Sequence, residues 1–481
     1  MERTRRNSGL EDRIRALTLK QRAPLFIVLG FLQALCFPPV GMAFLLPLCV
    51  AAFLVLLSGL DIKWAFRLGL LYGLAWSICD LFWFTNIFGA AAISLWVIIA
   101  FFPGFFAGLF VWLRKRLPQI PFCLLAALLW TGVEYYRSEP FVLNFGWLGL
   151  SYAVVNDHLL ARFASCIGCY GVTFLCALCA GIIAQSVIQG RRSWPYVAGA
   201  YASFLILYAI PLPAPRLEHP LRVRLVQAPS EDDEDQFRLS QPTPGSPIDI
   251  ILWPEYSFVS DPMRQPRTRA QLVEVARKNN AYLLFGAKDE FNPNDYKEFR
   301  NTAYMLDRAG NLVGTHVKNH TVHFFADGDR GTDSKAILTD LGMLGVGICF
   351  DMDYADVARR LTQDGAEVLL VPNNDPPNWG RAQRIQHRAM FQMRALECGR
   401  WLARADVAGG TSVALPSGVE LIRVNTTGAA KLDVTVSRLT YRNLFIRGGW
   451  MFGPLCMWVC VGMWAWEAAA ALRDRRGPTR A

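Results

Sequence analysis

The sequence predicts a membrane protein that carries one α/β domain together with about eight apolar helices. Of the 481 residues, 53% are hydrophobic and the mean hydropathy is positive, which is more apolar than a typical soluble enzyme. The apolar excess lies in residues 1–214 and in one segment near the C-terminus. Residues 215–447, between these two regions, have an ordinary globular composition. We therefore expect the α/β domain to be inserted before the last apolar helix.

Apolar runs mark the candidate membrane spans, because a helix needs about 20 apolar residues to cross a bilayer. We expect about seven spans in residues 24–214 and one more after the α/β domain. Their approximate ranges are 24–39, 41–59, 64–83, 90–113, 120–136, 163–189, 194–213 and 448–471.

The basic residues predict the orientation of these spans. Arginines and lysines precede the first span, recur in alternate connections and follow the last span, whereas the loops 36–41 and 84–89 are uncharged. By the positive-inside rule, the tails 1–23 and 472–481 lie in the cytoplasm and residues 215–447 lie across the membrane from them. The net charge of +10 comes mainly from these anchors, so it implies no nucleic-acid partner.

Strands and helices alternate along residues 215–447, a pattern that predicts a single α/β domain. The sequence favours helices at 268–278, 354–363 and 381–398. It favours strands at 220–227, 282–286, 301–307, 367–372, 401–405 and 411–415, and strands that end at positions 255, 318 and 349.

Each of the last three strands ends in a residue with reactive chemistry: Glu255, Lys318 and Cys349. A lone buried cysteine is more often a small core residue, but three reactive ends in order favour a site. Strand ends are where sheets of this class place their sites, so we expect these side chains to meet. A carboxylate can take a thiol proton, an ammonium can stabilise an oxyanion, and sulfur can carry an acyl group.

Two patterns imitate metal sites. The cysteines at positions 166, 169, 176 and 179 have paired C-x-x-C spacing, but they lie in one apolar segment and favour packing. The histidines at positions 316, 320, 323 and 387 lack carboxylates at metal-ligand spacing. We therefore expect neither a metal nor a cofactor.

The order Trp253-Pro254-Glu255, Lys318, Cys349 resembles the nitrilase (carbon–nitrogen hydrolase) superfamily. With the apolar spans, nearly the whole chain is similar to the apolipoprotein N-acyltransferases. The further motifs that carry this resemblance are Leu-Trp-Thr-Gly-Val-Glu-Tyr-Tyr-Arg at 129–137, Lys318-Asn319-His320, Asn374-Asp375, Trp379-Gly380, Gln386-His387, Arg394–Glu397, Gly399-Arg400 and Arg404-Ala405.

The resemblance implies a four-layer αββα domain on the periplasmic face of a bacterial inner membrane. It implies that an acyl chain passes from a phospholipid to Cys349 as a thioester, and then to the amino group of a diacylglyceryl-cysteine lipoprotein. Glu255 would act as general base and acid, and Lys318 with the Phe350 amide would stabilise the oxyanion. Phe350, Asp351 and Trp379 would contact the substrate, and we expect the protein to be a monomer.

Two departures from the family alter the surroundings of this triad. The family has Pro-Phe-Gly-Glu shortly after the lysine, and its glutamate supports the triad; the matching position here is Ala326, with Asp327 and Asp329 nearby. The family has Tyr-Glu after the cysteine, where this chain has Phe350-Asp351.

These departures leave two other functions open. A membrane-tethered amidase would use the same three residues but release its acyl group to water. A diverged, non-catalytic paralogue would serve as a membrane partner. At the end of the span at 120–136 and in its exit, Glu134 and Arg137 lie three residues apart on a helix, so they either pair with each other or mark a site.

Overall fold

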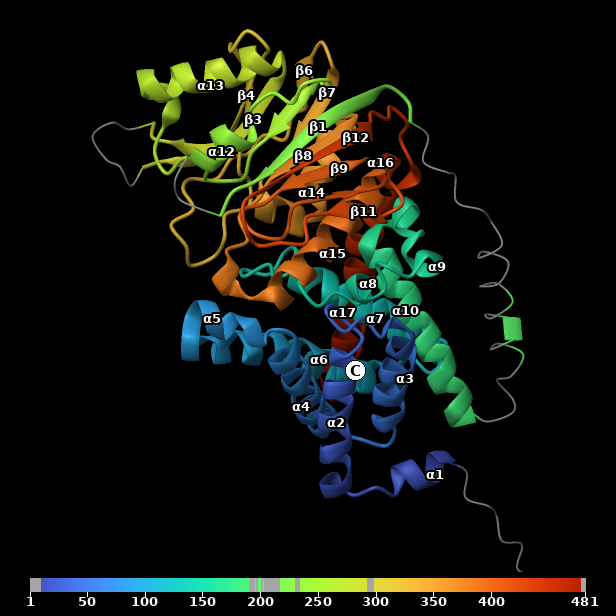
Figure 1. Ribbon diagram of the computed structural model, residues 1–481. Helices are drawn as coiled ribbons and strands as arrows, with labels where there is room; N and C mark the ends of the chain where they lie inside the picture. The colour runs from blue at the N-terminus through green and yellow to red at the C-terminus, as the bar shows by residue number, and fades with distance from the viewer. Residues whose placement is uncertain are drawn as a thin grey trace, which may run out of the picture. The chain divides into compact units, whose positions relative to one another are not determined.

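The computed structural model describes residues 10–189, 195, 198, 199, 202, 217–229, 234–291 and 298–476 (Figure 1). The chain forms two compact units, and each has its own internal packing. The helical unit comprises Met1–Phe163, Ile167–Pro211 and Met451–Ala481, and the α/β unit comprises Ala164–Cys166 and Leu212–Trp450.

The helical unit is built from apolar helices joined by short turns. Its longer helices are α2 (Leu19–Ala34), α3 (Leu46–Leu56), α4 (Ile62–Asp80), α6 (Ala92–Arg116), α7 (Phe122–Ser138), α10 (Ala164–Gln189), which kinks at Gly168, and α17 (Phe452–Arg476). Small residues let α4 and α6 pack closely, since a Cβ atom at Gly69 would lie 2.8 Å from the Pro103 carbonyl oxygen. Helix α17 packs on α7, where the Cys460 thiol donates to the Leu128 carbonyl oxygen at 3.2 Å.

Three helical segments among the described residues are long and apolar enough to cross a membrane: Phe82–Arg116, Ala164–Gln189 and Gly449–Leu472. They match the spans predicted at 90–113, 163–189 and 448–471. The spans predicted at 24–39, 41–59, 64–83 and 120–136 correspond to α2, α3, α4 and α7, which are shorter or less apolar. Most of the span predicted at 194–213 lies outside the described residues.

Glu134 and Arg137 on α7 both bond to the loop that follows this helix. The Arg137 guanidinium donates to the Trp147 carbonyl oxygen at 2.9 Å, and the Glu134 carboxylate accepts from the Leu150 amide at 3.1 Å. Glu134 also accepts from the Thr173 hydroxyl on α10 at 2.6 Å. These two charged side chains therefore fix the loop rather than serve only as a local helix pair.

The α/β unit contains two six-stranded sheets of matching design. The first has the order β12-β1-β2-β3-β4-β5, and the second has the order β11-β10-β9-β8-β7-β6. Each has three parallel strands flanked by antiparallel ones. The strands are β1 (Pro220–Gln227), β2 (Ile250–Leu252), β3 (Tyr282–Asp289), β4 (Arg300–Leu306), β5 (Leu312–Val317), β6 (Ile337–Thr339), β7 (Gly342–Val346), β8 (Val368–Pro372), β9 (Leu402–Ala405), β10 (Ser412–Ala414), β11 (Glu420–Arg423) and β12 (Ala430–Ser437).

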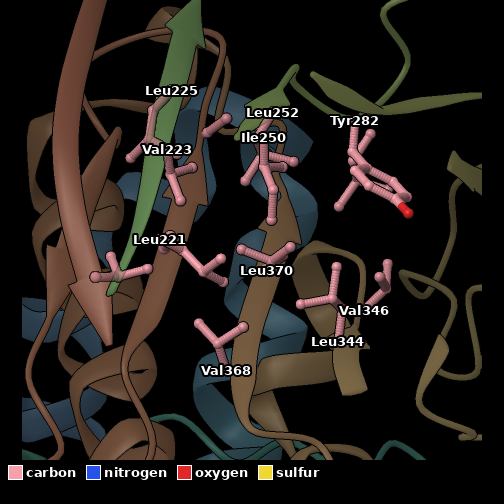
Figure 2. Close-up of a cluster of buried hydrophobic side chains, with 14 of the residues drawn as sticks. Leu221, Val223, Leu225, Ile250, Leu252, Tyr282, Leu344, Val346, Val368 and Leu370 are labelled. Carbon is pink, nitrogen blue, oxygen red and sulfur yellow. The ribbon is translucent and has the colours of Figure 1, made fainter. Parts of the chain in front are cut away.

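The central core lies between the two sheets, where apolar side chains of β1, β2 and β3 meet those of β7 and β8 (Figure 2). Strand alternation sends neighbouring residues to opposite faces. Thus Ile250 and Leu252 join the core between the sheets, whereas Ile251 between them faces outward. Close packing of the two inner faces holds the ends of the central strands in fixed positions.

Helices cover the outer faces of both sheets. The first sheet packs against α12 (Glu234–Leu239) and α13 (Pro266–Asn279). The second packs against α14 (Ala355–Gln363), α15 (Arg381–Cys398) and α16 (Leu444–Arg447). The result is the four-layer αββα arrangement that the resemblance implies. The helices predicted at 268–278, 354–363 and 381–398 are confirmed, whereas β6, β11 and β12 were not predicted.

Candidate active site

Cys349 lies on a strained turn directly after β7. Its φ angle is +43°, in the left-handed region that non-glycine residues rarely occupy, and the short 3-10 helix Cys349–Asp353 begins at this residue. Such a conformation costs on the order of 1 kcal/mol, so the surrounding contacts must hold it in place. The cysteine is buried, with 4% of its surface exposed.

Glu255 follows β2 through Trp253 and Pro254. Its backbone amide donates to the Asn373 carbonyl oxygen at 3.3 Å, which ties this end of the first sheet to the end of β8. Gly286 on β3 makes room for it, since a Cβ atom there would lie 2.7 Å from the Glu255 Cα atom.

The Glu255 carboxylate uses its two oxygens differently. Oε1 accepts from Lys318 Nζ at 2.7 Å and from Asn301 Nδ2 at 2.7 Å. None of the described residues donates a hydrogen bond to Oε2. Oε2 is therefore the oxygen available to exchange a proton with a thiol or an amine.

Lys318 follows β5 and is almost fully buried between two carboxylates. Its Nζ atom lies 2.7 Å from Glu255 Oε1 and 2.8 Å from Asp327 Oδ2. Asp327 is held in turn by the Tyr256 hydroxyl, the Asn301 side-chain amide and the Val322 backbone amide, each at 2.8 Å. The second carboxylate beside the lysine is thus Asp327, one position after Ala326 where the motif predicts it, whereas Asp329 is exposed.

The electrostatic effects among these groups follow from burial and charge. Burial works against the charged form of Lys318, but Asp327 and Glu255 outweigh it and raise the pKa of its ammonium. Burial raises the pKa of Glu255, and Lys318 only partly offsets this rise. The Lys318 charge keeps the pKa of Asp327 below its usual range despite burial. One cation therefore sits beside an ionised aspartate and a glutamate that is a stronger base than usual.

The charges of Glu255 and Lys318 also change the pKa of the Cys349 thiol. Burial raises the pKa of its thiol well above the usual value, and the Glu255 carboxylate raises it further. The Lys318 ammonium and a hydrogen bond from the Asn374 backbone lower it in part. The resting sulfur is therefore a thiol, and it needs a base to become a nucleophile.

Phe350 and Trp379, two of the predicted substrate contacts, are half-buried aromatic residues. The Phe350 ring lies 5.4 Å from that of Tyr354, and the Trp379 ring lies 5.6 Å from that of Phe325. Phe325 belongs to the same loop as Asp327. Both aromatic residues therefore lie on segments that adjoin the reactive side chains.

Asp351, the third predicted substrate contact, has a different position. Its carboxylate is fully buried and accepts from the Asn319 and His320 amides at 2.9 Å and from the Ile348 amide at 3.0 Å. His316 Nε2 lies 2.9 Å from it. These contacts fill the carboxylate, so Asp351 holds the Lys318 and Cys349 turns together. A contact between Asp351 and a substrate stays a prediction.

A second ionic cluster lies beside Cys349, and sequence reasoning assigned it no role. His387 on α15 approaches Asp375 with Nδ1 at 2.8 Å and Asp353 with Nε2 at 2.9 Å. Arg404 on β9 also donates to Asp375. The only available signal was that these positions fell in the motifs Asn374-Asp375, Gln386-His387 and Arg404-Ala405.

Cys349, Asp375 and His387 each offer one metal-ligand atom, and these atoms lie within 4.8 Å of one another. However, both imidazole nitrogens of His387 face carboxylates. The charges of Asp375 and Asp353 overcome burial and raise the pKa of His387 to about 9. A ring that carries a proton on each nitrogen has no lone pair for a metal, so we interpret the group as an ion-pair cluster.

Comparison with known proteins finds two matching domains and relatives that align over most of the chain. Residues 29–182 match the apolipoprotein N-acyltransferase N-terminal domain, and residues 222–436 match the carbon-nitrogen hydrolase family. An apolipoprotein N-acyltransferase of Geobacter metallireducens is 26% identical, covering 93% of this chain and 95% of its own. One of Gloeobacter violaceus is 25% identical, covering 93% of this chain and 94% of its own.

Among solved structures, an amidase of the nitrilase superfamily from Nesterenkonia is 21% identical, with a TM-score of 0.38, over 46% of this chain and 93% of the amidase. The chain thus carries both matched domains, and over almost its whole length it is similar to proteins named apolipoprotein N-acyltransferases.

Proposed function

We propose that this protein transfers a fatty acyl chain from a phospholipid to the N-terminal amino group of diacylglyceryl-cysteine in lipoproteins. The observation that carries the proposal is the contact between Glu255, Lys318 and Asp327 beside Cys349, in a chain that also has membrane-length apolar helices. Relatives that align over almost its full length are named apolipoprotein N-acyltransferases.

In the first half-reaction, Glu255 accepts the thiol proton of Cys349 through Oε2, and the sulfur attacks the ester carbonyl of the phospholipid. Lys318 Nζ and the Phe350 backbone amide stabilise the resulting oxyanion. The tetrahedral intermediate then breaks its bond to the glycerol oxygen, and Glu255 returns the proton to that oxygen. A lysophospholipid leaves, and the acyl chain remains on Cys349 as a thioester.

In the second half-reaction, the amino group of the lipoprotein attacks the thioester carbonyl. Glu255 takes the proton that the amine loses and passes it to the departing sulfur, so the thiol is restored and an amide forms. Asp327 supports both halves because it keeps Lys318 protonated, while Asn301 binds both carboxylates and fixes their spacing. No cofactor or metal takes part in either half.

The acyl donor and the lipoprotein acceptor are both membrane-bound, which explains why the enzyme would carry its own membrane domain. We propose eight spans, with residues 24–214 supplying seven and 448–471 the last. The distribution of basic residues supports two cytoplasmic tails and a periplasmic α/β domain at 215–447, in the inner membrane of a bacterium. Phe350 and Trp379 would meet the acyl chain, and the enzyme would act as a monomer.

The test is mass spectrometry of the purified full chain after incubation with phospholipid, followed by addition of a diacylated lipopeptide. We expect a hydroxylamine-labile acyl mass on the Cys349 peptide that moves to the lipopeptide amine. Cys349→Ala should show neither mass, whereas the matched variant Cys398→Ala should show both, because Cys398 is buried against α14 and β8 in the outer core. An adduct that decays to free fatty acid would assign a hydrolase, and no adduct with any phospholipid would assign a non-catalytic relative.

A further inference from the structure

His387 links the two chain segments that adjoin the nucleophile. Asp353, which His387 approaches at 2.9 Å, belongs to the same five-residue turn as Cys349. Asp375, which it approaches at 2.8 Å, lies just beyond the end of β8. All three side chains are at most 3% exposed. One side chain on α15 therefore joins the Cys349 turn to the segment that follows β8.

The segment after β8 contacts both reacting groups through its backbone. The Asn374 backbone hydrogen-bonds to the Cys349 sulfur, and the Asn373 carbonyl oxygen accepts from the Glu255 amide at 3.3 Å. Further contacts at Asp375 fix this segment: Gln383 donates to its carboxylate at 2.8 Å, and its backbone amide donates to Asp406 at 2.8 Å. A shift of Asp375 would therefore move the partners of both the base and the nucleophile.

We propose that His387 is a positioning residue, whose imidazolium clamps Asp353 to Asp375 and thereby holds the strained Cys349 turn in its reactive geometry. The proposed role affects the reactivity of the Cys349 thiol, which can be measured without acyl transfer. It rests on the proposed function only when acyl transfer is the quantity measured. His387 touches no substrate in this role. It acts through the two carboxylates that it joins.

The clamp requires the charged form of the ring. The ionisable groups that face His387 are Asp353 and Cys349 from the 3-10 turn and Asp375 from the segment after β8; Arg404 reaches the cluster through Asp375 from β9. Loss of the imidazolium would leave the two aspartates, Asp353 and Asp375, repelling each other with no cation between them.

The test is the rate at which iodoacetamide alkylates Cys349, followed by peptide mass spectrometry on the full chain in detergent. We expect His387→Gln to slow this alkylation at pH 7 about tenfold, which corresponds to about one pKa unit in the thiol. The difference should shrink above a pH of about 9, where the wild-type ring loses its proton. The control variant His219→Gln changes an exposed residue next to β1, and its rate of Cys349 alkylation should match that of the wild type.

Two further measurements separate positioning from a fold defect. Cys398 is fully buried, so it should stay unalkylated in every variant that keeps its fold. Asp353→Asn should slow alkylation as His387→Gln does, and the double variant should be little slower than either, because both changes break one clamp. If Cys398 becomes reactive in His387→Gln, that variant has a fold defect. The milder Asp353→Asn then decides whether the clamp positions Cys349.

The proposal is overturned if a folded His387→Gln or Asp353→Asn alkylates Cys349 at the wild-type rate, or if the two effects add. It is also overturned if the difference from wild type is the same at pH 7 and pH 10. These outcomes do not depend on acyl transfer. If the wild-type chain forms no acyl adduct with phospholipid but the variants slow the alkylation of Cys349 as described, the proposed function is refuted and the clamp is retained.

Discussion

The two sheets of the α/β unit have the same strand pattern, yet they supply different chemistry. The first sheet ends in Glu255 and Lys318, and the second ends in Cys349 and Asp375. Beside the ends of each sheet lies a cation between two carboxylates: Lys318 between Glu255 and Asp327, and His387 of α15 between Asp353 and Asp375.

The two clusters differ in how completely their carboxylates are occupied. Glu255 keeps one oxygen without a donor from the described residues, and its pKa is raised by burial. Both oxygens of Asp375 are bound, by His387, Gln383 and Arg404, and its pKa lies well below the usual range. The same charge pattern thus yields a group suited to proton transfer in one sheet and a fixed support in the other.

Removal of the proposed nucleophile, which the second sheet supplies, should have the largest effect on activity. Cys349→Ala should lower acyl transfer by at least about 10⁴-fold, because no other group can carry the acyl chain. The rate of lipopeptide acylation measures this loss. Retained activity in Cys349→Ala, with Cys398→Ala as the reference, would remove the second sheet from the chemistry.

Neutralising the proposed base tests the first sheet. Glu255→Gln keeps the shape of the side chain but cannot accept a proton, so Cys349 acylation should slow about 10²–10⁴-fold. The measurement is the rate of thioester formation from phospholipid. The surface change Glu274→Gln on α13 should leave that rate unchanged, and an equal effect of both variants would contradict the assignment.

Asp327 and Asp329 offer a matched pair within one loop. Asp327→Asn removes the charge that raises the pKa of Lys318, so acylation should slow about 10- to 100-fold through weaker oxyanion stabilisation. Asp329→Asn should have no effect, because this side chain is exposed. The ratio of the two acylation rates is the readout. If Asp329→Asn were the slower variant, the loop would be shifted so that Asp329, rather than Asp327, lies beside Lys318.

The smallest expected effect is a dependence of stability on pH. The pKa of His387 is about 9 in the fold and about 6.5 when unfolded, so the folded chain binds the extra proton between these values. Its contribution is complete below pH 6.5 and is lost as the pH rises through 9, on the order of 3 kcal/mol. The Tm should therefore fall over this range, and it should fall less in His387→Gln. Equal slopes in both proteins would show that His387 is neutral in the fold.

The sequence alone predicted the strand ends that carry Glu255, Lys318 and Cys349, because each follows a short apolar run with a local turn signal. It did not predict β12, which pairs with β1 over more than 200 intervening residues, as between Pro220 and Ser437. Edge strands with half-exposed faces carry a weak local signal, and their pairing depends on distant residues.

The contacts that hold the site residues in place also could not be predicted from the local sequence. The motif placed the second carboxylate at Ala326, but contacts with Tyr256 and Asn301, both distant in sequence, select Asp327. The role of His387 likewise depends on Asp353 and Asp375, which come from two other elements. Sequence patterns identify which residues can react, whereas the loops that orient them are set by long-range packing.

The raised pKa of the Cys349 thiol has a consequence for the lifetime of the enzyme. Oxidation of cysteine to sulfenic acid and beyond starts from the thiolate, so a sulfur kept as a buried thiol reacts slowly with peroxide. In the proposed reaction, Glu255 takes the proton when an acyl donor occupies the site. An idle molecule is thereby protected from oxidative damage to its cysteine by the burial that keeps the sulfur protonated.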